Sequence, residues 1–274
     1  MSFIKIDTDK CQRDRICGLE CPGKLIVFPE KDSYPKPVEH ADEFCIHCGH
    51  CVAVCPHGAL SLEGIGPESL AAVNPDILPD QSQIDHFLIT RRSTRTFKKK
   101  PLSRQQLEEL IDIARYAPTG SNKQQVYWLI VEDQAKIQHL AGLVIDWMRM
   151  LLAQSQDEAL NSRYGRLVEA WDKGIDRVLR GAPHVIMAHS PGDVFGAGTD
   201  CVISLAYLEL AAYSRGLGAC WAGFLNTAAT YHPPLQEALG LPDGHVPHGA
   251  LMIGYPVYKY HRIPQREPAR IIWR

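Results

Sequence analysis

The cysteines of this chain gather near its N-terminal end, in two runs of one spacing. In the second run three cysteines stand two residues apart, and a fourth follows three residues later, directly before proline. The first run repeats this spacing with an aspartate at its second position. The two runs are Cys11, Asp14, Cys17 and Cys21, then Cys45, Cys48, Cys51 and Cys55. This spacing is typical of bacterial proteins in which thiolates hold iron–sulfur clusters.

The spacing also predicts how these residues divide between two clusters. In two-cluster ferredoxins the fourth cysteine of each run binds the cluster of the other run. The first cluster would then have the ligands Cys21, Cys45, Cys48 and Cys51. The second would have Cys11, Cys17, Cys55 and, at its fourth corner, either Asp14 or no residue. Because a carboxylate is a harder ligand than a thiolate and holds iron less firmly, the second cluster is a [4Fe-4S] cluster with Asp14 or a [3Fe-4S] cluster.

Other uses of cysteine agree less well with the sequence. Zinc sites prefer two C-x2-C pairs a loop apart, whereas here a triplet followed by Cys-Pro occurs twice. A disulfide framework needs an oxidising compartment and usually an even number of cysteines, and the chain has 9. The first ten residues lack the apolar run of a signal peptide. We therefore expect a cytoplasmic protein.

Length and composition allow one or two domains and exclude some partners. The chain has 274 residues, 45% of them hydrophobic, and a formal net charge of −2. A nearly neutral chain gives no sign of a nucleic-acid surface, and no window has the roughly 18 uncharged apolar residues of a membrane span. Glycines and prolines cluster after the second cysteine run. We expect an iron–sulfur domain over residues 1–65, a linker over 66–80 and a second domain over 81–274.

The second domain alternates helical and strand signals. Ser103 and Gln106 form a capping-box pattern at the start of a helix. Short apolar runs rich in β-forming residues predict strands over 126–132, 184–188, 219–225 and 250–254. Residues 200–215 predict a helix that is apolar nearly all round, which must be buried, and that ends at Gly216. The fold class expected is α+β, with a central sheet covered by helices.

Four segments of this domain resemble the flavin-dependent nitroreductase family. They are RRSTRTF at 91–97, APTGSN at 117–122, GLGACWAGF at 216–224 and GYP at 254–256, with Arg266 near the end. They occur in the family's order. The fusion to a two-cluster ferredoxin module looks like the ferredoxin-nitroreductase subgroup, so the resemblance covers nearly the whole chain. Residues 143–180 exceed what a minimal member of the family needs.

The resemblance implies a homodimer with FMN at the subunit interface. The flavin phosphate would be held by Arg91, Ser93 and Arg95, which are flanked by Arg92, and by a basic residue of the C-terminal segment, with Arg266 the best fit and Arg262 the second choice. The loop with Pro118, Thr119, Gly120 and Asn122 would come from the neighbouring subunit. The backbone amides around Ala222 and Gly223 would lie at the flavin edge, near N5. Cys201 and Cys220 are interpreted as small buried hydrophobes.

The expected function is that of an FMN-dependent oxidoreductase. Electrons would enter through the chain's own clusters, and a nitro compound, quinone or similar electron-poor molecule would accept them. No side chain stands out as a catalytic acid, which fits a family in which flavin N5 carries the chemistry. The alternative is an electron-transfer protein that serves a partner complex. An external ferredoxin or reductase is a possible electron donor. The sequence has no G-x-G-x-x-G motif after a predicted strand, so we expect no dedicated nicotinamide-binding domain.

Overall fold

The chain divides into two compact units, which a computed structural model describes over residues 3–274. The first unit runs to Pro79 and includes Ser121–Lys123. The second comprises Asp80–Gly120 and Gln124–Arg274. Each unit has its own buried cluster of apolar side chains, so each is described by itself.

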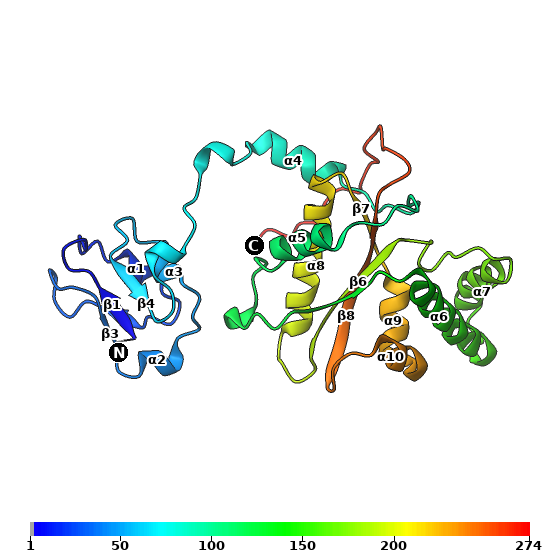
Figure 1. Cartoon of the computed structure of the whole chain (residues 1–274), viewed down its shortest axis with the longest axis horizontal. Helices are drawn as coiled ribbons and strands as arrows, with labels where there is room; N and C mark the ends of the chain where they lie inside the picture. Colours follow the sequence, from blue (N-terminus) through cyan, green and yellow to red (C-terminus); the bar gives the residue numbers. More distant parts are fainter. Residues whose placement is uncertain (1–2) are drawn as a thin grey trace. The chain divides into compact units, whose positions relative to one another are not determined.

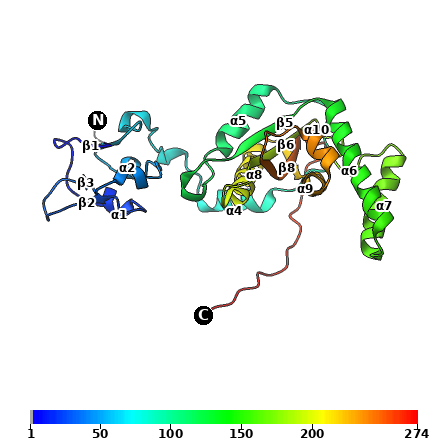
Figure 2. The same cartoon turned by 90° about the horizontal axis from the view of Figure 1, so that it is seen from below.

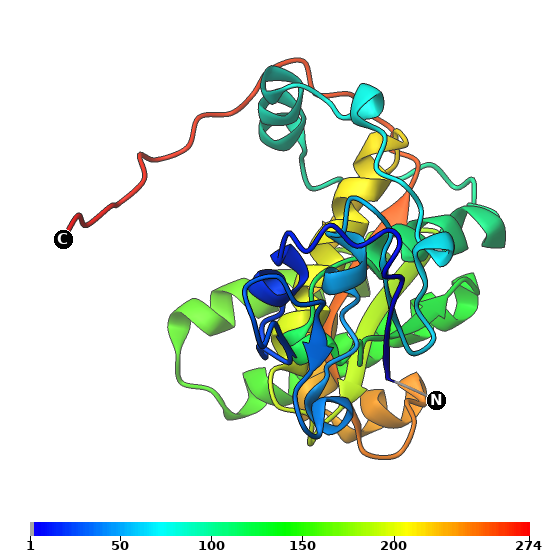
Figure 3. The same cartoon turned by 90° about the vertical axis from the view of Figure 1, so that its left-hand side faces the viewer.

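The first unit is built from short elements around a small core. Its two antiparallel pairs are β1 (Ile4–Ile6) with β4 (Leu60–Leu62) and β2 (Ile26–Val27) with β3 (Lys36–Pro37). Its helices are α1 (Ile16–Glu20), α2 (Ala41–Phe44) and α3 (His50–Ala53). These elements are drawn in blue to cyan in Figure 3. Such a small core buries little apolar surface, which makes bound metal a natural source of further stability.

The segment expected to be a linker carries only two short turns. Residues 66–80 contain the 3-10 turns η1 (Pro67–Ser69) and η2 (Pro75–Ile77), and most of the segment is exposed. Helix α4 (Gln81–Thr90) follows. This helix begins with a capping box. The Asp80 carboxylate accepts a hydrogen bond from Gln83 N at 2.9 Å, and Asp80 N donates one to the Gln83 side chain at 3.0 Å.

A four-stranded antiparallel sheet forms the centre of the second unit. Its strands are β5 (Tyr127–Val131), β6 (His184–Pro191), β7 (Gly218–Trp221) and β8 (His245–Gly254), in the order β5-β6-β8-β7. The α+β class is thereby confirmed. The strand predicted over 219–225 is wrong at its C-terminal end, because β7 stops at Trp221 and helix α9 (Gly223–Tyr231) begins two residues later.

Helices cover both faces of this sheet, as Figure 1 shows. One face packs against α5 (Arg104–Ala114) and α8 (Ala197–Ser214). The other packs against α6 (Gln134–Gln154), α9 and α10 (Pro233–Leu239), and α7 (Glu158–Asp172) lies against α6. Strand β6 is therefore buried on both faces. This burial explains why residues 185–188 are all apolar instead of alternating between apolar and polar.

The predicted helix boundaries have the expected caps. Ser103 accepts a hydrogen bond from Gln106 N at 3.2 Å, and Ser103 N donates to the Gln106 side chain at 3.0 Å, so the capping box is present. Helix α8 has Arg215 as its C-cap and ends before Gly216, whose φ of 70° requires a residue without a Cβ. The short turn η3 (Gly120–Asn122) follows α5.

Beyond the sheet, the chain ends in an extended segment. Residues 257–274 are exposed and have no helix or strand, and Figure 2 shows them as a long trace. Within the described part of the chain, no helix is both long enough and apolar enough to cross a membrane.

Candidate functional site

The cysteines of the first unit fall into two groups in space. The pKa of the Cys17 thiol is raised to about 11, mainly by burial and also by the nearby Cys55, Asp14 and Cys11, while a hydrogen bond from the Gly18 N–H lowers it. Charges act this way only at short range. Cys17, Cys55, Asp14 and Cys11 are therefore neighbours, although Cys55 comes from the other run.

The second group is centred on Cys51. The pKa of its thiol is raised to about 11, mainly by burial and also by Cys21, Cys48 and Cys45. These neighbours again come from both runs, and the two groups are the two sets that the spacing predicts. The Cys17 and Cys51 thiols hold protons at neutral pH without metal, so a bound cluster has to displace those protons.

Backbone amides point at several of these sulfurs. Leu25 N donates to Cys21 Sγ, His47 N to Cys45 Sγ and Ala59 N to Cys55 Sγ, each at 3.4 Å. Hydrogen bonds to the sulfur stabilise the thiolate form and tune the potential of an iron–sulfur cluster. The donor set of the first unit therefore fits thiolate-held clusters.

Asp14 has contacts of two kinds. One carboxylate oxygen accepts from Ile16 N at 3.3 Å and so closes a turn, and the other lies 3.9 Å from His57 Nε2. Asp14, Cys11, Cys17 and Cys55 line one small hollow. Among residues 3–274 no three acidic, histidine or cysteine side chains surround a position for a single metal ion.

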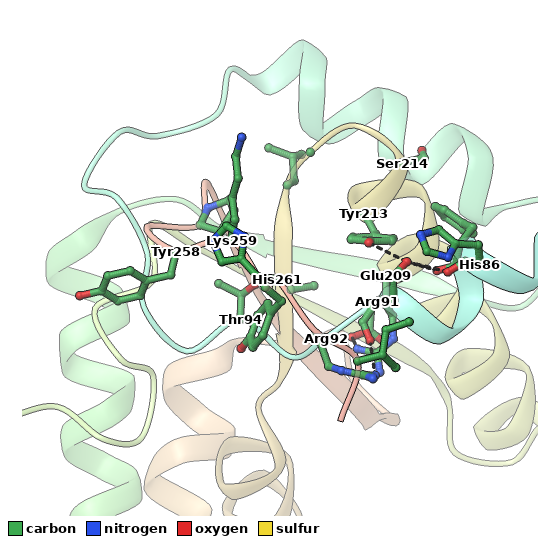
Figure 4. A pocket seen from close by; sticks show the side chains of 18 of the residues that line it. His86, Arg91, Arg92, Thr94, Glu209, Tyr213, Ser214, Tyr258, Lys259 and His261 are labelled. Carbon is green, nitrogen blue, oxygen red and sulfur yellow. Dashed lines mark hydrogen bonds and ion pairs between the residues drawn. The ribbon is translucent and has the colours of Figure 1, made fainter. Parts of the chain in front are cut away.

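The second unit contains a large open pocket, which Figure 4 shows from close by. It is bounded by α4, the start of the 91–97 segment, α8 and the first part of the C-terminal segment, and it encloses about 2410 Å³ with the adjoining solvent. Three of the predicted flavin-binding residues line it, namely Arg91, Arg92 and Arg262, and Lys259 adds a fourth cation. Arg266 is not among the residues that line the pocket.

The first of these cations is already paired. Arg91 Nη1 donates to Glu209 Oε1 at 2.9 Å, and Trp221 Nε1 donates to the other carboxylate oxygen at 3.2 Å. Glu209 is a buried residue of α8. The sequence prediction missed its role, although an acidic residue in an otherwise apolar helix is a signal, since a buried charge needs partners.

The 91–97 segment is attached to the edge of the sheet. Thr94 N donates to Ala219 O at 2.8 Å, which places the segment beside β7. A Cβ at Gly218 would lie 2.2 Å from Thr94 Oγ1, so only glycine allows this approach. Gly218 is therefore needed for the contact between the 91–97 and 216–224 segments rather than for a direct contact with a ligand.

Ser93 and Arg95 flank Thr94, which lines the pocket, and the hydroxyl of the pocket residue Tyr260 donates to Ser93 O at 3.2 Å. Burial raises the pKa of the Cys220 thiol, whereas Arg95, Arg180 and a hydrogen bond with Ser93 lower it, and Glu209 raises it. Cys220 itself is buried, as is Cys201, in agreement with their interpretation as small hydrophobes.

The two amides predicted at the flavin edge differ in availability. Ala222 N donates to Ala250 O at 2.8 Å, so this amide is bound within the sheet. Gly223 is the exposed first residue of α9, and its N–H has no acceptor within the helix. Gly223 is the amide that remains free for a ligand.

The loop predicted to come from a neighbouring subunit is fixed by its own contacts. Gly120 N donates to both carboxylate oxygens of the buried Asp200 at 3.1 Å, and Thr119 accepts from Gln124 N at 3.0 Å. The Asn122 side chain donates to the carbonyls of Ile46 and His47, within the first unit. Pro118, Thr119, Gly120 and Asn122 are not among the residues that line the pocket.

Comparison with known proteins decides the family. Residues 88–255, more than half of the chain, match the nitroreductase family, and residues 6–59 match the 4Fe-4S dicluster domain. This chain belongs to the nitroreductase family. The predicted combination of an iron–sulfur domain with a nitroreductase-type oxidoreductase domain is thereby confirmed.

Individual relatives agree with this assignment. An FMN reductase [NAD(P)H] of Bacillus subtilis is 31% identical over 198 residues, which are 67% of this chain and 71% of that protein. An iodotyrosine deiodinase of Thermotoga neapolitana is 26% identical over 188 residues, or 65% of this chain and 90% of that one. The crystal structure of a nitroreductase with bound FMN from Bacteroides fragilis shares the fold, with a TM-score of 0.57 and 21% identity over 71% of this chain and 100% of that chain.

Proposed function

We propose that this chain is an FMN-dependent oxidoreductase that takes electrons through its own iron–sulfur clusters and passes them to an electron-poor acceptor. The observation that carries the proposal is the fusion of a unit with two groups of four ligand residues to a nitroreductase-family domain with a cationic site. A nitro compound or a quinone is the proposed class of acceptor.

The chain's own residues would hold each group in place. The two cysteine groups, of which the group around Cys17 includes Asp14, would bind two clusters, which pass single electrons when present. Arg91, Arg92, Ser93, Arg95 and Arg262 would surround the phosphate end of FMN, and the free Gly223 amide would meet the flavin edge. Bound FMN supplies the chemistry of collecting single electrons and delivering them in pairs. Both sites fit these groups in charge and in donor type.

A homodimer is part of the proposal. Helix α4 exposes Ile84, Leu88 and Ile89, and the C-terminal segment exposes Ile272 and Trp273. Exposed apolar side chains are typical of surfaces that a second protein covers. The molar mass of the purified protein by light scattering tests this part.

The first experiment measures the cofactors. Protein purified without oxygen is expected to contain about eight irons per chain, or about seven with a three-iron cluster, together with matching sulfide and FMN. Zinc in place of iron, with no sulfide, would contradict the proposal.

The second experiment tests the electron path. Cys45→Ser with Cys51→Ser should remove one cluster and slow the reduction of FMN by a reduced ferredoxin, while a buried cysteine outside both groups gives the control Cys201→Ser. An unchanged rate in the double variant would show that electrons reach FMN by another route, such as direct hydride transfer from NAD(P)H.

The third experiment separates an enzyme from a carrier. Chemically reduced protein is mixed with nitroaromatics or quinones, and reoxidation is followed by absorbance. Rapid reoxidation by these small molecules supports the enzyme. Reoxidation only by a protein partner would favour the electron-transfer function instead.

A further inference from the structure

Two arginines lie at the rim of the hollow around Cys17. Arg13 and Arg15 stand on either side of Asp14 in the sequence, and both are exposed. Both also line the hollow together with the cysteines of that group. Because the donor set of this hollow fits a thiolate-held cluster, a partner that binds the two arginines lies next to that cluster.

Each arginine is held in place by an aromatic ring and a backbone carbonyl. The Arg13 guanidinium lies 4.9 Å from the centre of the Tyr34 ring, and its Nη1 donates to Asp32 O at 2.9 Å. The Arg15 guanidinium lies 5.0 Å from the centre of the Phe28 ring, and its Nη2 donates to Phe28 O at 3.5 Å. A stacked guanidinium has already lost rotamer freedom, so a partner that binds it pays less side-chain entropy.

The two positive charges have no acidic partner within the described part of the chain. Among residues 3–274 neither Arg13 nor Arg15 forms an ion pair. The aspartate between them, Asp14, accepts from Ile16 N and faces His57 instead. Exposed arginines that are fixed in position and lack an internal acid favour an acidic protein surface as their partner.

The other group of cysteines, around Cys51, has acidic surroundings. Glu20 is exposed and directly precedes Cys21 of that group. Helix α2 carries the exposed residues Asp42 and Glu43 and ends directly before the next cysteine of the group. An acidic partner is repelled by these carboxylates and attracted by the two arginines. The charge pattern of the first unit therefore favours the Cys17 side as the place where such a partner binds.

We propose that Arg13 and Arg15 form the docking surface for a small acidic electron-carrier protein, which binds beside the group around Cys17 and not beside the group around Cys51. The inference rests on the proposed function and adds the chemistry of the electron donor and its place of entry. A reduced carrier gives up one electron here and becomes oxidised, the cluster of the Cys17 group takes that electron, and no covalent bond forms or breaks. Opposite charges speed the encounter of two proteins, which suits a carrier that has to bind and leave quickly.

The first test measures binding without electron transfer. An acidic ferredoxin and an acidic flavodoxin, both oxidised, are titrated at low salt into the full chain with its cofactors, and cytochrome c is the basic probe. Arg13→Gln and Arg15→Gln should each raise the Kd of the acidic carriers about fivefold, and the double variant should raise it roughly twentyfold. Added salt should weaken binding more in the wild type than in the double variant. Cytochrome c should bind the variants no more weakly.

The matched control is Lys24→Gln. Lys24 is an exposed cation three residues after Cys21, on the side of the other cysteine group, and its Nζ donates to Leu19 O. Its φ of 52° is left-handed, as are those of Arg13 at 59° and Arg15 at 67°. The control thus removes one charge from the same kind of backbone position and should change the Kd by less than about twofold. Equal weakening by Lys24→Gln would reduce the effect to net charge and overturn the inference.

A second variant protects the test against loss of a cluster. Arg13 and Arg15 neighbour predicted cluster ligands, so iron and sulfide are measured in every variant. Arg13→Lys with Arg15→Lys keeps both charges without the planar guanidinium groups, and its Kd should stay within about threefold of the wild type. If the Kd instead follows the iron content of the variants and not their charge, the arginines have a purely structural role and the inference is overturned.

The last measurement separates the inference from the proposed function. Reduction of the protein by reduced ferredoxin and by photoreduced deazariboflavin, a small donor, is followed by absorbance. The double Gln variant should slow the first reaction and leave the second unchanged. If neither acidic carrier binds, or if both bind without regard to the arginines, the docking surface is wrong, and reduction of FMN by the small donor still supports the function. If the carriers bind through the arginines but no electrons arrive at FMN, the docking surface stands and the proposed function is wrong.

Discussion

The Arg91 guanidinium donates a 2.9 Å hydrogen bond to the Glu209 carboxylate across 118 residues of sequence. Only 23% of the arginine side chain and 11% of the glutamate side chain are accessible to solvent. Because Trp221 donates to the second carboxylate oxygen, the charge of Glu209 is compensated from two elements, the 91–97 segment and β7. The pair joins α8 to the segment that carries the predicted flavin-binding arginines.

Removing Arg91 is expected to affect stability as well as flavin binding. Arg91→Ala leaves a largely buried carboxylate with one partner, which costs about 1.5–3 kcal/mol of unfolding free energy. FMN binding should weaken by a similar amount if Arg91 also contacts the phosphate. Chemical unfolding and flavin titration measure the two effects separately. Arg92→Ala, whose side chain donates to the Arg91 carbonyl, is the control for the stability measurement alone. If the single variant Arg91→Ala and the double variant Arg91→Ala with Glu209→Gln have the same unfolding free energy, the loss of Arg91 leaves no uncompensated charge on Glu209.

Asp14 is expected to make one cluster labile. A carboxylate or an open corner holds the fourth iron less firmly than a thiolate, so mild oxidation should produce a three-iron signal in electron paramagnetic resonance, and added ferrous iron should remove it. Asp14→Cys should abolish that behaviour. The control Asp42→Cys adds a thiol in the exposed part of α2. Persistence of the signal in Asp14→Cys would mean that Asp14 only closes the turn with Ile16.

Gly218 is expected to tolerate no side chain. In Gly218→Ala the new methyl group meets Thr94 Oγ1, and the overpacking should cost about 1–3 kcal/mol of unfolding free energy. Adding Thr94→Ala should restore much of the loss. As a contrast, Gly165→Ala in α7 meets open space and should stabilise the protein by about 0.5–1 kcal/mol. Thermal unfolding of the three variants and the wild type provides the measurement. A neutral Gly218→Ala would refute the close approach of the two segments.

His184 is expected to make stability fall in mild acid. Burial lowers its pKa, only partly opposed by Glu132, and its Nε2 accepts from Leu102 N at 2.8 Å. Since the unfolded chain binds a proton below about pH 6.5 and the folded state resists it, the unfolding free energy decreases as pH falls from there toward the folded-state pKa. His184→Gln should reduce this slope in urea titrations between pH 8 and pH 5. The exposed His139→Gln should leave the slope unchanged. Burial also lowers the pKa of His189 and His248, so some slope should remain.

Local patterns in the sequence determined a large part of this protein. The cysteine spacing predicted both groups of neighbours in the first unit, because residues two or three apart in a tight loop have few possible directions. The box of Ser103 and Gln106 and the glycine after α8 likewise depend on contacts within one turn of helix. The order of the family-like segments was sufficient to predict the family and the α+β fold class.

Contacts between distant segments were decided only by the tertiary structure. No local pattern places Glu209 opposite Arg91, because these neighbours are determined by how α8 packs beside the sheet edge and the 91–97 segment. The amide of Ala222 is bound within the sheet for the same reason, since its acceptor lies on β8. Sequence spacing governs ligands that one loop supplies, whereas a site assembled across a sheet depends on the strand order and register that long-range packing selects.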